Sequence, residues 1–385
     1  MRKVLLCTLA FLLVGVMAFG CLVSAADKVT INLVTAGDQN MVDLFRMELG
    51  PLFTERNPWI EVRVVGTGPG DAGSQKIIDK LNAQKKAGRD KWDIDVAVIH
   101  EIGAAFCVQD ELIKKYAPSA ITYQYVTSQS AKRALGVDVE GYVIPMFQSQ
   151  TVLAYNPKYI PEPPRSFEEF VAWAKKNPGK FGYNGIKQGA SGVSFVASWL
   201  YWKTGKYDIY ALTGPFDEKY MEDWDKAFGE LKEFDKYATM TAGNAGTLDM
   251  LSRGEIWIGP VWVDMFYSWV ADGRMDPNMR LVLPAPGMAG QPMYYVIPSK
   301  AANPEAALKF VEFATSPEIQ AKYIVEKFNW YPGIDGSYIE DYLPEEVWNK
   351  VFRDVTPEDL AKYARAFPIK DYYNAMMEAY ERAMR

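Results

Sequence analysis

The chain has 385 residues, of which 49% are hydrophobic and 14% aromatic, enough to bury one large core or two. Its 48 acidic residues outnumber the 42 basic ones, which disfavours nucleic acid and anionic membranes as partners. Of its three cysteines only Cys107 lies beyond residue 25, so we expect stability to come from packing and not from an internal disulfide.

Residues 1–25 are typical of a secretory signal peptide. A basic start is followed by an uncharged apolar run, and residues 23–25 (Val-Ser-Ala) supply small side chains for cleavage. One alternative is an uncleaved anchor, since residues 4–23 are barely long enough to span a bilayer. Another is a lipoprotein acylated at Cys21, although Phe19 stands where a small residue is wanted. We expect an exported protein, in the periplasm or at the extracytoplasmic face of the cell membrane.

Strand and helix patterns then alternate along the first part of the chain. Strands are predicted at 29–37, 60–65 and 92–100, with helices at 41–58 and 74–88 between them. This βαβαβ order predicts a parallel sheet covered by helices on both faces. Because ligands of such sheets bind at the carboxyl ends of the strands, we expect three loops on one rim, at 35–40, 66–73 and 100–103.

The second of these loops contains the spacing Gly68, Gly70, Gly73, which matches a dinucleotide fingerprint, with Asp93 about 20 positions further on. A nicotinamide cofactor is disfavoured because the motif follows the second strand and not the first, and because Asp71 would repel a pyrophosphate. An exported protein also meets little of this cofactor. We interpret the stretch as a loop facing a ligand cleft, with a plain turn as the alternative, and we expect no cofactor and no metal.

Further elements follow in the middle and at the end of the chain. Two extended runs are predicted within 141–157, and strands at 254–263, 280–287 and 291–300. A helix is expected to begin at a Ser-x-x-Glu capping box at Ser166. The last third is helical, with starts in which a capping residue precedes Pro-Glu, at Asn303, Ser316 and Thr356.

Three tracts resemble those of bacterial extracellular solute-binding proteins, the receptor subunits of ABC importers, in the group that includes the maltose- and spermidine-binding proteins. They begin with VIPMFQSQTVLAYNP at 143, LSRGEIWIGPVW at 251 and IPSKAANPEAALKF at 297. The resemblance implies an α/β fold of two lobes joined by a multi-strand hinge, as in type 2-like periplasmic binding proteins, with the ligand cleft between them. It implies lobe one at 27–145 plus 290–328, and lobe two with the hinge crossings at 146–289 plus 329–385.

Candidate ligand-binding residues lie next to predicted strand ends. The carboxylates of Asp38, Asp71, Glu101 and Asp264 are suited to paired sugar hydroxyls or a cationic amine; the alternative is solvated loop charge. The Trp262 ring is suited to stacking on a sugar or holding a cation, and the alternative is core packing.

The remaining candidates are polar or aromatic residues beside the expected cleft. His100, the one histidine of the sequence, lies on the expected rim, and Ser191 lies near a helix start, where it would cap the helix or donate to ligand. The others are Gln39 in the first loop, Gln148 at the first crossing, and Trp330 and Tyr331 at the final crossing.

The resemblance implies a receptor that binds a small organic solute by lobe closure and delivers it to the transmembrane subunits of an ABC-type importer. We favour a sugar as the solute, with a polyamine- or thiamine-type cation as the alternative, and expect a monomer. A secreted carbohydrate-active enzyme with cleft carboxylates is the alternative of another class, and a sensor partner is a third hypothesis. An enzyme is disfavoured because a serine hydrolase would need His100, and the sequence has no Gly-x-Ser-x-Gly.

Overall fold

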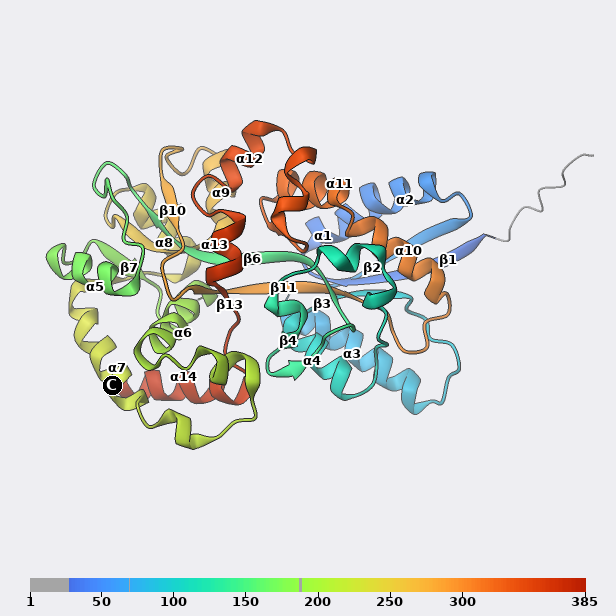
Figure 1. The fold of residues 1–385 in the computed structure, drawn as a ribbon, viewed down its shortest axis with the longest axis horizontal. Coiled ribbons are helices and arrows are strands. Elements are labelled where there is room, and N and C mark those ends of the chain that lie inside the picture. Colours follow the sequence, from blue (N-terminus) through green and yellow to red (C-terminus); the bar gives the residue numbers. More distant parts are fainter. Residues whose placement is uncertain (1–27, 69, 187–188) are drawn as a thin grey trace, which may run out of the picture.

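The computed structural model describes residues 28–68, 70–186 and 189–385, so the expected leader lies outside the described part of the chain. Two α/β lobes lie side by side, and strands β6 (Ile144–Tyr155) and β11 (Met288–Val296) run across from one lobe to the other (Figure 1). This is the architecture that the family resemblance of the sequence implies.

Lobe one is built on β1 (Val29–Ala36), β2 (Ile60–Gly68) and β3 (Val96–His100). These strands are parallel in the order β2-β1-β3, as the βαβαβ pattern predicts. Its helices are α1 (Gln39–Asp43), α2 (Gly50–Arg56), α3 (Gly70–Lys86), α4 (Glu101–Gln109), α10 (Pro304–Ala314) and α11 (Pro317–Ile319). Helix α3 begins four residues before the predicted start, so the glycine-rich loop is shorter than the sequence suggests.

Lobe two carries β7 (Phe181–Tyr183), β8 (Ala238–Met240) and β9 (Ile258–Trp262), parallel in the order β9-β7-β8, and β10 (Arg280–Val282). Its helices are α5 (Phe167–Lys176), α6 (Ala190–Thr204), α7 (Trp224–Phe234), α8 (Gly243–Ser252), α9 (Val263–Ala271), α12 (Glu345–Val351), α13 (Pro357–Tyr363) and α14 (Lys370–Met384). Helix α9 follows β9 without a loop, which brings the first turn of α9 to the carboxyl end of the strand.

The hinge is made of strands that pair across the two lobes. Strand β6 is one continuous strand and not the two extended runs that the sequence predicts; its first half pairs with β11 and its second half with β9. Two short strands add to it, β12 (Tyr331–Pro332) beside β6 and β13 (Ala364–Arg365) beside β11. A single strand that spans both lobes lets each lobe move against the other about a shared backbone.

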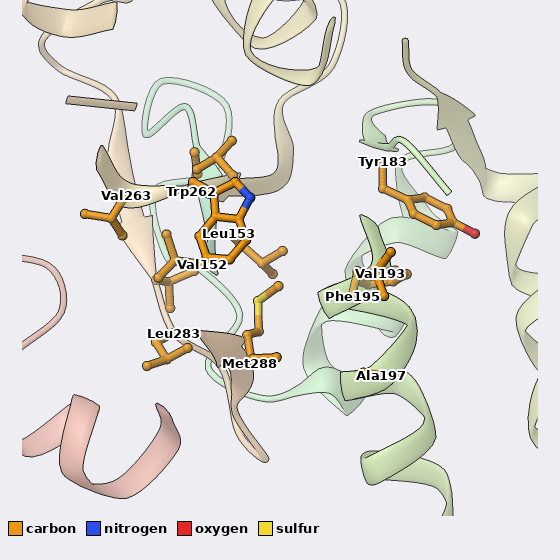
Figure 2. Close-up of a cluster of buried hydrophobic side chains, with 14 of the residues drawn as sticks. Val152, Leu153, Tyr183, Val193, Phe195, Ala197, Trp262, Val263, Leu283 and Met288 are labelled. Carbon is orange, nitrogen blue, oxygen red and sulfur yellow. The ribbon is translucent and has the colours of Figure 1, made fainter. Parts of the chain in front are cut away.

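Each lobe buries its own hydrophobic cluster. In lobe one, Phe310 packs edge-to-face against Phe53 and at a tilt against Phe45. In lobe two, residues such as Leu153, Phe195 and Trp262 gather around β6, β9 and α6, as Figure 2 shows. Cys107 lies in the lobe-one cluster, where burial raises the pKa of its thiol to about 12, in keeping with a packing role.

Candidate functional site

A cavity of about 400 Å³ lies between the lobes at the carboxyl ends of their parallel strands. Lobe one supplies the loop after β1 and the end of β3, lobe two supplies the starts of α6, α8 and α9, and the hinge strands supply the rest. The lining residues are Gly37, Asp38, Asn40, Met41, His100, Phe147, Ser149, Ala190, Asn244, Trp262, Asp264, Met265, Gln291, Met293 and Trp330. The structure thus brings together five of the predicted site residues: Asp38, His100, Trp262, Asp264 and Trp330.

Asp264 is the most constrained carboxylate of this cavity. It lies in the first turn of α9 and accepts a hydrogen bond from the Ser149 hydroxyl on β6 over 3.1 Å. Burial raises the pKa of Asp264, while hydrogen bonds from Ser149 and the Trp330 indole act in the opposite direction. The described lining contains no Lys or Arg, so Asp38 and Asp264 give the cavity a negative character.

The aromatic rings of the cavity are held by packing. Trp262 ends β9 and precedes α9; it is 8% exposed and belongs to the lobe-two cluster, where Figure 2 places it close to Leu153. Trp330 lies between Phe147 and Phe328, stacked at centroid distances of 4.0 and 4.6 Å. Rings held in this way offer a preorganised surface to a ligand face.

Asn244 is a cavity residue that the sequence analysis did not identify. It lies at the start of α8, after β8, and β8 is only three residues long, too short to be recognised from its pattern. Ser191 is fully buried beside it: its backbone N–H donates to the Asn244 Oδ1 over 3.2 Å, and its hydroxyl lies 2.7 Å from the same oxygen. Ser191 therefore orients Asn244 and does not line the cavity.

His100 and Glu101 lie at the junction of β3 and α4. The His100 backbone N–H donates to the Ser74 hydroxyl over 3.0 Å, and His100 Nδ1 lies 3.1 Å from the same oxygen, which fixes the ring. Glu101 is 2% exposed and lies behind the cavity lining. Burial, and then the Glu101 carboxylate, raise the pKa of Tyr294 on β11.

The other predicted residues lie elsewhere. Gln39 is exposed and its amide donates to Asp43 over 2.8 Å. The backbone of Asp71 is in the first turn of α3, and its side chain is outside the described part of the structure. Gln148 and Tyr331 line a second cavity and not this one.

The described residues include no group of three or more His, Cys, Asp or Glu placed to hold a metal ion. Among the helices of residues 28–385 that the structure describes, none is both long enough and apolar enough to cross a membrane.

Comparisons with known proteins agree with the fold. The family described as bacterial extracellular solute-binding protein matches residues 53–351. No curated protein matches the chain. The spermidine/putrescine substrate-binding protein PotD of Streptococcus pneumoniae is similar with a TM-score of 0.66 and 15% identity, over 92% of this chain and 100% of that one.

Two further solved structures show the same arrangement. AttC of Agrobacterium tumefaciens, in an open unliganded conformation, has a TM-score of 0.67 and 17% identity, over 93% of this chain and 100% of that one. A solute-binding protein of Thermotoga lettingae bound with α-D-tagatose has a TM-score of 0.64 and 16% identity, over 93% and 94% of the two chains. At such identities the likeness shows the fold, and the predicted two-lobe α/β architecture is confirmed.

Proposed function

The chain belongs to the bacterial extracellular solute-binding proteins, and on this premise we propose that it is an extracytoplasmic receptor that binds a small organic solute between its lobes and delivers it to the membrane subunits of an ABC-type importer. The observation that carries the proposal is the cavity lined by strand ends of both lobes and floored by the hinge strands. A solute that contacts both sides stabilises the closed arrangement by the difference between its affinities for the closed and open forms.

The division of the chain follows from the same proposal. Residues 27–145 plus 290–328 act as lobe one, and residues 146–289 plus 329–385 act as lobe two and the hinge crossings. The receptor works as a monomer at the extracytoplasmic side of the membrane, after removal of residues 1–25. N-terminal sequencing of the exported protein checks the last point, with a start at Ala26 or Asp27 expected and a lipid-modified Cys21 contradicting it.

The solute presents several hydrogen-bond donors, because the cavity offers mainly acceptors. Asp38 and Asp264 are acceptors when ionised, and Gln291 adds a carbonyl oxygen. The Asn244 Oδ1 already accepts from Ser191, so Asn244 keeps its amide N–H groups as donors to the solute. Together with the Trp262 ring, this combination suits a sugar, whose hydroxyls pair with carboxylates and whose ring face stacks on an aromatic.

An organic cation is the second candidate, and Asp264 is the observation in its favour. Its carboxylate is buried, burial raises its pKa, and no described Lys or Arg lines the cavity. An ammonium group would supply the missing counter-charge and could lie over the face of Trp262.

The experiment is native mass spectrometry of the freshly purified protein, followed by calorimetric titration of the retained solute. Lobe closure predicts a smaller radius of gyration with solute in small-angle scattering, and an unchanged radius with a bound solute contradicts it. Asp264→Asn distinguishes the two solute classes: a neutral sugar loses roughly tenfold in affinity with one weakened hydrogen bond, whereas a cation loses on the order of a hundredfold. Steady conversion of a bound oligosaccharide, abolished in Asp264→Asn, would favour the enzyme.

A further inference from the structure

A second cavity, of about 240 Å³, lies on the other face of the hinge strands. Along β6, Ser149 lines the cleft cavity while its neighbour Gln148 lines the second one. Along β11, Gln291 lines the cleft and Pro292 lines the second cavity. Because successive side chains of a strand point to opposite faces, the two cavities are separated by the thickness of the hinge.

Both lobes contribute to the second cavity. Residues 127–130 come from lobe one, Gln148 and Tyr331 from the hinge strands, and Tyr207 with residues 352–366 from lobe two. A molecule that fills this cavity contacts both lobes.

Among the lining residues that the structure describes, Arg365 on β13 is the one cation. The guanidinium Nη1 donates to the carbonyls of Lys362 and Ala364, over 2.8 and 3.3 Å, and the group lies over the ring of Tyr207 at 4.8 Å. Its Nε is buried and has no hydrogen-bond partner among the described residues. A positively charged donor in this setting is suited to a negatively charged acceptor.

Tyr331 and Asp335 are two further polar residues of the lining. Tyr331 is 1% exposed, and its hydroxyl also has no hydrogen-bond partner among the described residues. The carboxylate of Asp335 is the other charged group of the lining, and it is occupied by the Thr127 hydroxyl at 3.0 Å and by the backbone N–H of Ser337 at 3.0 Å. Asp335 thus keeps its charge but has its oxygens engaged, and Arg365 is the cation of the described lining with which an anion can pair.

One part of the wall is apolar, while residues 127–130 and Gln148 add neutral polar groups elsewhere. Ile334, Phe352 and Leu360 lie in the apolar part, with prolines and alanines between them. We propose that this cavity is a second ligand site, which takes a small organic anion whose carboxylate binds Arg365 and whose apolar body packs against Ile334, Phe352 and Leu360. Because the site spans both lobes, its ligand biases lobe closure and so changes the affinity of the cleft, a coupling that rests on the receptor function proposed above.

The test uses the full exported chain, with benzoate as the probe and benzamide as its uncharged analogue, each titrated by calorimetry without any cleft solute. Benzoate binds and benzamide binds at least tenfold more weakly. Arg365→Gln loses tenfold or more of the benzoate affinity, Arg365→Lys retains part of it, and Tyr331→Phe loses less. Trp257→Phe, at a residue that stacks on Tyr159 and lines neither cavity, leaves benzoate affinity unchanged.

A second variant covers the case in which Arg365→Gln does not fold. Ala361→Trp adds bulk to the exposed rim of the cavity and leaves Arg365 in place, and it abolishes benzoate binding. The proposal is overturned if benzoate does not bind, if benzamide binds equally well, or if Ala361→Trp or a folded Arg365→Gln binds benzoate as the parent does. Loss of benzoate binding in a folded Trp257→Phe would also overturn it. Since no cleft solute is present, these results are independent of the receptor function; only the scattering radius with and without benzoate tests the coupling.

Discussion

The hydroxyl of Ser149 donates to the carboxylate of Asp264 over 3.1 Å and thereby joins hinge strand β6 to the first turn of α9. Asp264, which we propose to bind the solute, is thus tied to β6, the hinge strand about which the lobes move. A change in its charge is expected to affect both solute binding and the stability of the free protein.

Asp264→Asn should make the ligand-free protein more stable at neutral pH while weakening solute binding. Burial raises the pKa of Asp264, so the folded state holds the proton more tightly than the unfolded state. Below the ordinary pKa both states are protonated; as pH rises through the folded pKa, ionising the buried group lowers the free energy of unfolding. Melting temperatures from pH 3 to 7 check this, and a variant that is less stable than the parent at pH 7 contradicts it.

Trp262→Ala should lower both stability and affinity, because the ring belongs to the lobe-two core and also lines the cleft. Loss of a large buried side chain costs about 3–5 kcal/mol in the free energy of unfolding. Trp262→Phe keeps an aromatic ring and should lower the free energy of unfolding less, while still weakening the binding of the solute.

Trp257→Phe is the matched control for this prediction, because Trp257 stacks on Tyr159 and does not line the cleft. Calorimetric titration of the three folded variants is the measurement. If Trp262→Phe binds the solute with the affinity of the parent, Trp262 acts only in core packing and the prediction is wrong.

Gly333→Ala should be strongly destabilising. A Cβ at this position would lie 2.0 Å from the backbone oxygen of Pro145 in β6, and the backbone cannot give way as a flexible side chain can. We expect a loss of about 1–3 kcal/mol or more in urea unfolding. Gly229→Ala is the control: it lies within α7 with nothing within 4 Å of the new Cβ, so it should gain about 0.5–1 kcal/mol. Equal effects in the two variants would refute the steric explanation.

Asp235 should give the protein a pH-dependent stability near pH 6. Burial raises its pKa from 3.8 to about 6, against the hydrogen bond from the Tyr183 hydroxyl at 2.9 Å. The folded state therefore binds its proton more tightly, and stability falls as pH rises from about 4 through 6. In Asp235→Asn this part of the pH dependence is absent, since Asn keeps an acceptor for Tyr183 but does not titrate. Parallel melting curves for the two proteins across this range would show that Asp235 does not contribute.

Local patterns in the sequence were sufficient to predict the order of the helices and strands. The alternation at 29–37 and the helical spacing at 41–58 specified the first βαβ unit, because one buried face repeats at a fixed period within a few residues. The Pro-Glu starts at Asn303 and Thr356 correctly placed α10 and α13, since Pro suits the first helical position; at Thr356 the side chain also caps the first turn. Short strands such as β8 were missed because three residues carry no readable period.

By itself, the sequence determined the alternating α/β elements, because these depend on periods and caps that act over a few residues. The two-lobe architecture came from the resemblance of three tracts to a known family. Only the tertiary structure decided which hinge side chains face the cleft. Gln148 and Ser149 are neighbours with equally polar side chains, yet they line different cavities on opposite faces of β6. The face that each presents depends on the register of β6 against β11 and β9, whose partners lie more than 100 positions away in the chain. A one-residue shift in that register would exchange the two faces, and no pattern within β6 itself fixes it.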